Sequence, residues 1–164
     1  MQQRQQAVPM PSETAAGRLL PGGRLQPVPA AGSHAGCLLC GAKNPLSMHL
    51  QFVADDNHVV YADFQAHNML QGYQGIIHGG VTCALLDAAM THCLFNRSIE
   101  AVTGELKVKF IQPVPCRACL QLKAWVEKAF QPLYVLRAEL RCEDSLLASA
   151  EAKFMQTATD YFGL

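Results

Sequence analysis

Asp87 is the residue of this sequence whose surroundings point most clearly to chemistry. It is the only charged residue between Val81 and Phe95, a stretch in which eleven of fifteen residues are apolar. A carboxylate among apolar neighbours needs hydrogen bonds, or else its pKa rises. A structural Asp bonded to a nearby strand is the ordinary alternative. Keeping an acid in such a place costs free energy, however, so we predict that Asp87 has a chemical task.

Two glycines, Gly79 and Gly80, directly precede this apolar stretch. If a helix begins there, their backbone N–H groups are unpaired and lie at the positive end of the helix dipole. Such amides bind an oxyanion, and the missing side chains let a carbonyl group come close. A Gly-Gly pair also starts many ordinary helices, so the dipeptide alone is weak evidence. The neighbouring His78 either hydrogen-bonds a carbonyl or the loop, or only fixes the start of the helix.

The spacing of Gly79 and Asp87 limits what one chain can do. Eight residues separate them, which is about 12 Å along a helix that rises ~1.5 Å per residue. Attack on a carbonyl needs an approach of about 3–3.5 Å. One helix therefore cannot supply both the amide and the acid to one carbonyl group, and we predict that the two come from different subunits of a homo-oligomer.

The elements that must position these residues follow from hydrophobic periodicity. Residues 81–95 are apolar nearly all round, which predicts a helix enclosed by the rest of the protein and ended by Asn96-Arg97. The Gly-rich segment 71–80 before it predicts a functional loop. Alternating runs predict antiparallel strands on both sides of the helix, so the fold class is α+β, a curved antiparallel sheet wrapped around one long central helix. The runs are 48–53 and 58–64, joined by a turn, then 105–111, 120–126, 133–142 and 148–154.

Composition restricts the remaining possibilities. The chain has 164 residues, of which 50% are apolar, and 13 basic residues balance 13 acidic ones. A net charge of zero disfavours nucleic acid and anionic membranes as partners. No apolar run is long enough to span a bilayer, and the first residues lack a secretory signal, so we expect a soluble protein without a membrane partner. Seven cysteines, an odd number, indicate a reducing compartment and predict a cytoplasmic location.

The domain organisation is predicted from the change in composition along the chain. Residues 1–36 are rich in Pro, Gly and Gln and lack a hydrophobic period, so we predict a flexible leader there. An amphipathic targeting helix is the alternative, and the frequent prolines argue against it. Residues 37–158 form the predicted domain, and residues 159–164 form a C-terminal tail.

The Cys37-Leu-Leu-Cys40-Gly sequence has the spacing of a zinc knuckle, with His34 and His49 nearby as possible further ligands. A single Cys-x-x-Cys is a weak signal, because a structural zinc site needs four ligands and no second pair has matching spacing. We therefore predict no metal in the site, and whether Cys37 and Cys40 bind one stays open.

Two segments carry a family resemblance. The first runs Gly75-Ile-Ile-His78-Gly79-Gly80-Val-Thr-Cys-Ala-Leu-Leu-Asp87, and the second runs Thr103-Gly-Glu-Leu-Lys-Val-Lys-Phe-Ile-Gln-Pro113. Together they resemble the hotdog-fold acyl-CoA thioesterases of the phenylacetate-type (PaaI-like) family, over roughly residues 46–156. The most specific element is His-Gly-Gly with an Asp nine residues after the His, joined to the second segment. The resemblance implies a hotdog fold, a homodimer or dimer of dimers with composite active sites, and hydrolysis of an acyl-CoA thioester to free acid and CoA without metal or organic cofactor.

The resemblance also implies roles. Asp87 activates a water as general base or attacks to form a mixed anhydride, and the residues alone do not separate these. The Gly79 amide of the partner subunit, with His78, binds the thioester oxygen. Thr103 matches a hydroxyl position that helps hold the water near the acid, although a Thr in a strand is commonplace.

One position departs from the family pattern. Many relatives carry Asn or Gln about six residues before the His, where this sequence has Gly72, so Gln71, Gln74 or Asn68 would have to substitute. If none does, a non-catalytic acyl-CoA-binding sensor on the same fold is the alternative; an acyl hydratase is weaker. The sequence does not specify the length of the acyl chain. Gly80, at the helix start, is a further substrate-binding candidate. The candidates for binding the CoA phosphates are Lys107, Lys109 and Arg117. The alternative is that these three side chains only form a solvated face.

Overall fold

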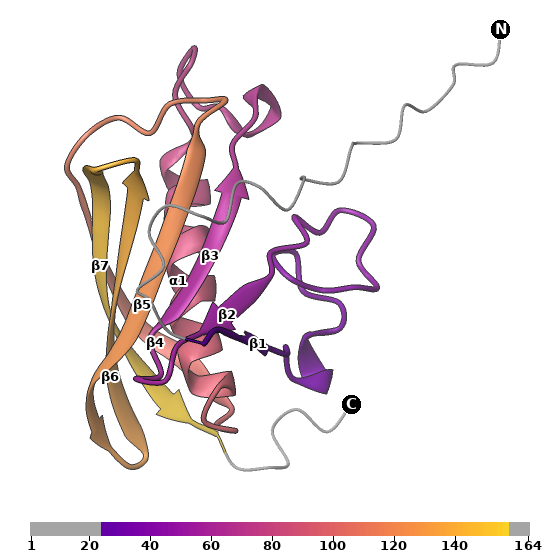
Figure 1. Ribbon diagram of the computed structural model, residues 1–164, viewed down its shortest axis with the longest axis vertical. Helices are drawn as coiled ribbons and strands as arrows, with labels where there is room; N and C mark the ends of the chain where they lie inside the picture. Colours follow the sequence, from indigo (N-terminus) through magenta and orange to yellow (C-terminus); the bar gives the residue numbers. More distant parts are fainter. Residues whose placement is uncertain (1–23, 158–164) are drawn as a thin grey trace, which may run out of the picture.

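The computed structural model describes residues 24–157. Within them the chain forms one α-helix, two short 3₁₀ turns and seven strands (Figure 1). Their order is β1 (Gln26–Val28), η1 (Gly32–His34), β2 (Phe52–Ala54), β3 (Val60–Gln65), η2 (Asn68–Leu70), α1 (Gly79–Phe95), β4 (Ala101–Phe110), β5 (Cys119–Phe130), β6 (Leu133–Cys142) and β7 (Ser145–Gln156).

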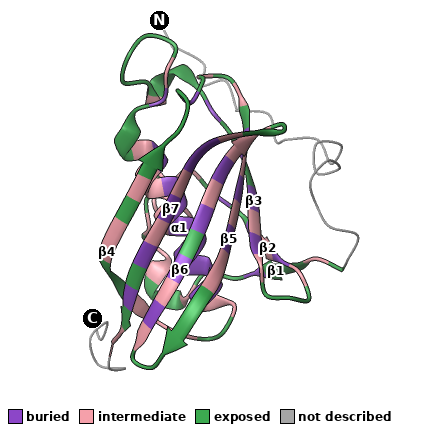
Figure 2. Ribbon diagram, turned by 90° about the vertical axis from the view of Figure 1, so that its left-hand side faces the viewer, coloured by how far each residue is buried: buried purple, intermediate pink, exposed green. Residues whose placement is uncertain are grey.

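The strands form a single antiparallel sheet in the order β1-β2-β3-β5-β6-β7-β4. The sheet curves around α1, which packs mainly across β5 and β6 (Figures 1 and 2). Strand β4 follows the helix in the chain but lies at the far edge of the sheet, beside β7. This arrangement confirms the predicted α+β hotdog architecture.

Alternation along the strands explains why the sheet covers the helix. In β6 the side chains of Leu136, Ala138 and Leu140 are buried on the helix side, and Arg137 between them is exposed. Every second residue of a strand points to the same face, so one face is apolar and the other is wet. The inward residues of β7 include three small alanines, which leave room for the helix against the sheet. These are Ala148, Ala150 and Ala152.

Helix α1 is enclosed as its composition predicts. Ten of its seventeen residues are buried, and they lie all round the helix axis rather than along one stripe. The helix begins at Gly79, two residues before the predicted start, and Asn96 follows its last residue. Among residues 24–157 no helix combines the length and the apolar character that crossing a membrane requires.

The first described residues differ from the prediction. Residues 1–36 were expected to lack structure, but β1 pairs with β2 and the side chain of Val28 is buried. Proline does not prevent this, because an edge strand can carry residues without a backbone N–H group. The boundary expected at residue 36 is therefore wrong for residues 26–34. The earlier part of the predicted leader and the predicted tail at 159–164 lie outside the described residues.

Candidate active site

Asp87 lies in the middle of α1 and is paired with Thr103 of β4. The Thr103 hydroxyl donates a 2.7 Å hydrogen bond to Asp87 Oδ1. Burial raises the pKa of the Asp87 carboxyl, while the bond from Thr103 and the nearby His34 ring oppose that rise. The carboxyl is thus half-buried, hydrogen-bonded on one oxygen and biased toward accepting a proton, which are properties of a general base.

A β-bulge explains why Thr103 faces the helix. The pairing of β4 with β7 shifts between Thr103 and Glu105, so Gly104 is an extra residue in β4. Thr103 is opposite the buried Phe154, whereas Glu105 is opposite the outward-facing Lys153. Strict alternation would put Thr103 on the outer face with Glu105. The bulge turns it inward, as bulges next to functional sites often do.

The start of α1 separates the roles of its two glycines. The side chain of His78 caps the helix, because its Nδ1 accepts a 2.9 Å hydrogen bond from the Gly80 N–H. The Gly79 amide has no acceptor within the described part of the chain, and Gly79 is exposed. Of these two amides, only that of Gly79 is therefore free to bind an oxyanion, because the Gly80 amide already donates to His78. The ring of Phe110 lies next to Gly79, since a Cβ there would be 3.5 Å from Phe110 Cζ.

Gly79 and Asp87 lie on one helix, and their separation of eight residues is the spacing from which the sequence predicts a composite site. Asp87 faces Thr103 in the middle of the helix, whereas the free Gly79 amide is at its N-terminal end. The two groups of one chain are thus too far apart to act on one carbonyl.

The loop before the helix shows what occupies the position of the missing amide. Gly72 lies close to His78: a Cβ at position 72 would be 3.2 Å from the His78 ring, so there is little space for a side chain there. Gln71 is exposed, and its side-chain oxygen accepts a hydrogen bond from the Gly75 amide at 3.3 Å. Asn68 is exposed in η2. The structure therefore holds Gln71 to its own loop and brings neither of these two amide side chains to Asp87.

The basic candidates for the CoA phosphates lie elsewhere. Lys107 forms a 2.7 Å ion pair with Glu105. With Lys109 it lines an open cavity of about 470 Å³ on the outer face of β4, β6 and β7, away from α1. Arg117 is an exposed loop residue with a positive φ of 71°. The structure does not bring these three cations together with Asp87.

His34 is a neighbour of Asp87 that the sequence does not link to it. It lies with Asp87 around a small cavity of about 90 Å³, together with Cys37, Cys40 and the buried His92. Burial lowers the pKa of His34, and the charges of Glu100 and Asp87 oppose this. Fifty-three residues separate His34 from Asp87. No local motif joins them, so their proximity follows only from the packing of the N-terminal segment on the helix.

Comparison with known proteins agrees with this fold. Residues 74–149 match the family model described as the thioesterase superfamily. A curated relative, the acyl-coenzyme A thioesterase THEM4 of Bos taurus, is 27% identical over 89 residues, covering 54% of this chain and 36% of that protein. This chain thus aligns with about a third of the length of that relative.

Two solved structures share the fold. The PaaI protein of the E. coli phenylacetic acid degradation operon has a TM-score of 0.63 and 16% identity, with 68% of this chain and 81% of that one covered. A hypothetical thioesterase of Streptococcus pneumoniae, solved with coenzyme A, has a TM-score of 0.59 and 16% identity, with 61% and 82% covered. Asp→Ala and Thr→Ala variants of the second protein have also been solved, and the two substituted positions are sixteen residues apart.

The match spans the helix start, Asp87 and Thr103, and the surrounding fold is that of the solved thioesterases. The resemblance predicted from the sequence is therefore confirmed: residues 74–149 match the thioesterase superfamily and are folded as hotdog thioesterases are.

Proposed function

We propose that this chain hydrolyses acyl-CoA thioesters to free acid and CoA. The observation that carries the proposal is the half-buried Asp87 carboxyl held by the Thr103 hydroxyl at 2.7 Å. Asp87 and Thr103 are sixteen residues apart, the same separation as the Asp and Thr substituted in the S. pneumoniae thioesterase. The match of residues 74–149 to the thioesterase superfamily and the CoA bound in that related structure support the class of substrate.

In the proposed reaction the Asp87 carboxylate takes a proton from a water molecule, which attacks the thioester carbonyl. The alternative is direct attack by Asp87, which gives a mixed anhydride that water then hydrolyses. Thr103 positions the acid through its bond to Oδ1, so that Oδ2 faces the substrate. No step of either route requires a metal or an organic cofactor.

The oxyanion that forms during attack accepts a hydrogen bond from the Gly79 amide of a second protomer. Two observations support this arrangement: the Gly79 amide is free, and it lies eight residues from Asp87 on the same helix. One well-aimed backbone donor contributes about 3–4 kcal/mol of transition-state stabilisation. The working unit is therefore a homodimer, alone or within a dimer of dimers. The seven cysteines of each chain are all unpaired, which suits a reducing compartment, and we place the protein in the cytoplasm.

A thiol-release assay with a panel of acyl-CoAs tests the proposal. We expect turnover that is abolished in Asp87→Ala and retained in Lys128→Ala, whose side chain is exposed on β5. Tight binding of acyl-CoA without turnover would instead identify the acyl-CoA sensor that the Gly72 position suggests, and would refute the enzyme.

A further inference from the structure

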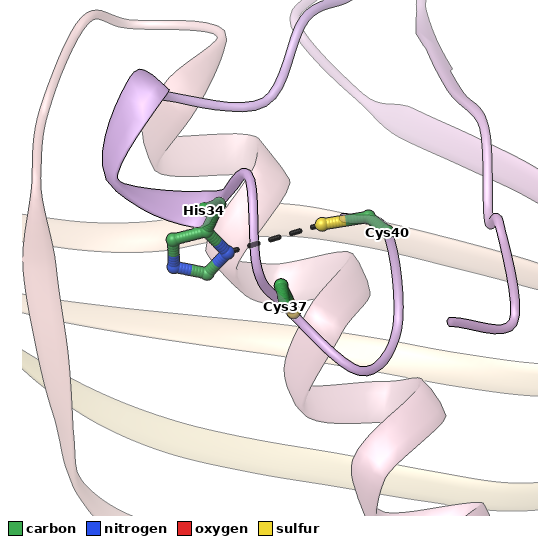
Figure 3. Close-up of side chains that lie close together, drawn as sticks. All are labelled: His34, Cys37 and Cys40. Carbon is green, nitrogen blue, oxygen red and sulfur yellow. Dashed lines mark hydrogen bonds between the residues drawn. The ribbon is translucent and has the colours of Figure 1, made fainter. Parts of the chain in front are cut away.

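His34, Cys37 and Cys40 converge beside α1 (Figure 3). One potential ligand atom from each lies within 4.8 Å of the others, and His34 Nδ1 is 3.8 Å from Cys40 Sγ. In a tetrahedral zinc site with Zn–S bonds of ~2.3 Å and Zn–N bonds of ~2.0 Å, the ligand atoms are roughly 3.5–3.8 Å apart. The His34–Cys40 pair is already at this separation, and the third ligand has to move by no more than about 1 Å.

The loop that carries the two cysteines holds them in place. The Cys37 N–H donates to His34 O and the Gly41 N–H donates to Cys37 O, both at 2.9 Å. A side chain at Gly41 has no room, because a Cβ would lie 2.4 Å from Cys37 N. The Leu39 N–H donates to Cys37 Sγ at 3.4 Å, and a backbone donor to sulfur is the outer contact that a ligating thiolate needs.

Contacts outside the loop fix the histidine. The His34 ring lies edge-on to Phe95 of α1, with ring centroids 4.8 Å apart. The Lys43 N–H donates to Ala35 O at 2.9 Å, which closes the chain after the second cysteine back onto the first turn. The three potential ligands are therefore presented by packed and hydrogen-bonded backbone before any ion binds.

We propose that His34, Cys37 and Cys40 bind one Zn²⁺ ion. Two thiolates and an imidazole select a soft or borderline cation and disfavour Mg²⁺ and Ca²⁺. A water completes the tetrahedron from the cavity of about 90 Å³ that the three side chains line together with Asp87 and His92. A water needs only about 10–15 Å³ of such space. The ion closes residues 34–40 into a clamp that holds the N-terminal segment against α1, on the side where Asp87 lies.

Cobalt is the probe for this site, because Co²⁺ replaces zinc and thiolate ligation gives it a charge-transfer band. The full chain, reduced and stripped with a chelator, is titrated with CoCl₂. We expect a band that saturates at one equivalent and disappears when one equivalent of ZnCl₂ is added. Cys40→Ser and His34→Gln each lower the affinity for cobalt at least ~100-fold. Two controls retain it: Cys119→Ser, which changes an exposed cysteine outside the cluster, and His49→Gln, which changes the nearby histidine that the structure places outside the cluster.

The same titration contains the results that overturn the proposal. No band in the reduced wild-type chain, or a band that Cys40→Ser and His34→Gln leave unchanged, excludes the site. A Cys37–Cys40 disulfide in the purified chain, with no metal uptake after reduction, assigns the pair to redox chemistry instead. Thermal unfolding of the wild-type chain with and without ZnCl₂ guards against a variant that fails to fold, since binding to the folded state must raise Tm. Metal uptake is measured without substrate, so its result does not depend on whether the protein has thioesterase activity.

Discussion

The Thr103 hydroxyl donates to Asp87 Oδ1 at 2.7 Å, from the edge strand β4 to the middle of the enclosed helix α1. This bond occupies one carboxylate oxygen and leaves Oδ2 without a hydrogen bond within the described residues. It also stabilises the charged form of an acid whose pKa burial raises. Burial thus makes the Asp87 carboxylate more basic, while the bond from Thr103 holds one of its oxygens in place and limits that increase.

Removing the Asp87 charge is predicted to abolish activity and to stabilise the fold. Asp87→Asn should lower kcat by roughly 10²–10⁴-fold, the usual loss for a general base. Burial raises the pKa of Asp87, so the folded state binds this proton more tightly than the unfolded chain. Binding of this proton therefore stabilises the fold fully at a pH below the pKa of Asp87 in the unfolded chain. This stabilisation is lost as pH rises through the pKa of Asp87 in the folded state.

We therefore expect Asp87→Asn to melt at a higher temperature than the wild type at neutral pH, and this advantage to shrink as pH falls through the folded pKa. Thermal unfolding followed by circular dichroism at several pH values measures it. A variant that is less stable than the wild type at neutral pH would show that the Asp87 charge supports the fold instead.

Thr103→Val is predicted to move the pH profile of hydrolysis. Val fits a strand but cannot donate to Asp87 Oδ1, so the carboxyl loses the bond that lowers its pKa. The acid limb of kcat/KM against pH should shift to higher pH, and activity at neutral pH should fall by roughly 10-fold or more. Thr103→Ser keeps the hydroxyl and should restore both. An unshifted acid limb in Thr103→Val would contradict the role of this bond.

His78 is predicted to act through the helix start. Its Nδ1 accepts from the Gly80 N–H, so His78→Ala should cost about 0.5–2 kcal/mol of stability, the usual loss of an N-cap. His78→Asn supplies another cap acceptor and should recover most of that loss. Denaturant unfolding and kcat are measured for both variants. If His78→Asn is stable but loses kcat as severely as His78→Ala, the imidazole contacts the substrate instead.

Gly79→Pro removes the proposed oxyanion donor with little change to the helix. Pro suits the first position of a helix, and His78 before it already has the extended ψ of 134° that a following Pro requires. We expect kcat to fall by roughly 10²–10³-fold. Gly79→Ala adds a similar Cβ at an ordinary 3.5 Å from Phe110 but keeps the N–H, and it should remain close to wild type. Equal losses in both variants would mean that space, not the amide, matters at this position.

The sequence predicts much of this fold because its patterns are local. The enclosed helix follows from an apolar stretch with one acid, and the boundaries of β6 match the alternation of 133–142 residue for residue. The end of α1 at Phe95 follows from Asn96-Arg97. Periodicity needs only neighbouring residues, which is why these elements are read correctly.

The rest depends on contacts between distant segments. Strand β1 is stabilised by pairing with β2, and the three residues Gln26–Val28 have no periodicity of their own. The alternation of apolar and polar residues does not predict the bulge at Gly104, so strict periodicity puts Thr103 on the wrong face of the sheet. The position of His34 near Asp87 results from packing across fifty-three residues, and no spacing rule reaches that far.

Mixed dimers test most directly whether Asp87 of one protomer works with the Gly79 amide of another. Asp87→Ala and Gly79→Pro chains, each inactive alone, are unfolded together, refolded and assayed with an acyl-CoA. A random mixture is half heterodimers, and each heterodimer has one site with both groups intact, so about one quarter of the wild-type activity per chain should return. If the refolded mixture is as inactive as its components, while wild-type chains treated in the same way recover, the composite site is wrong.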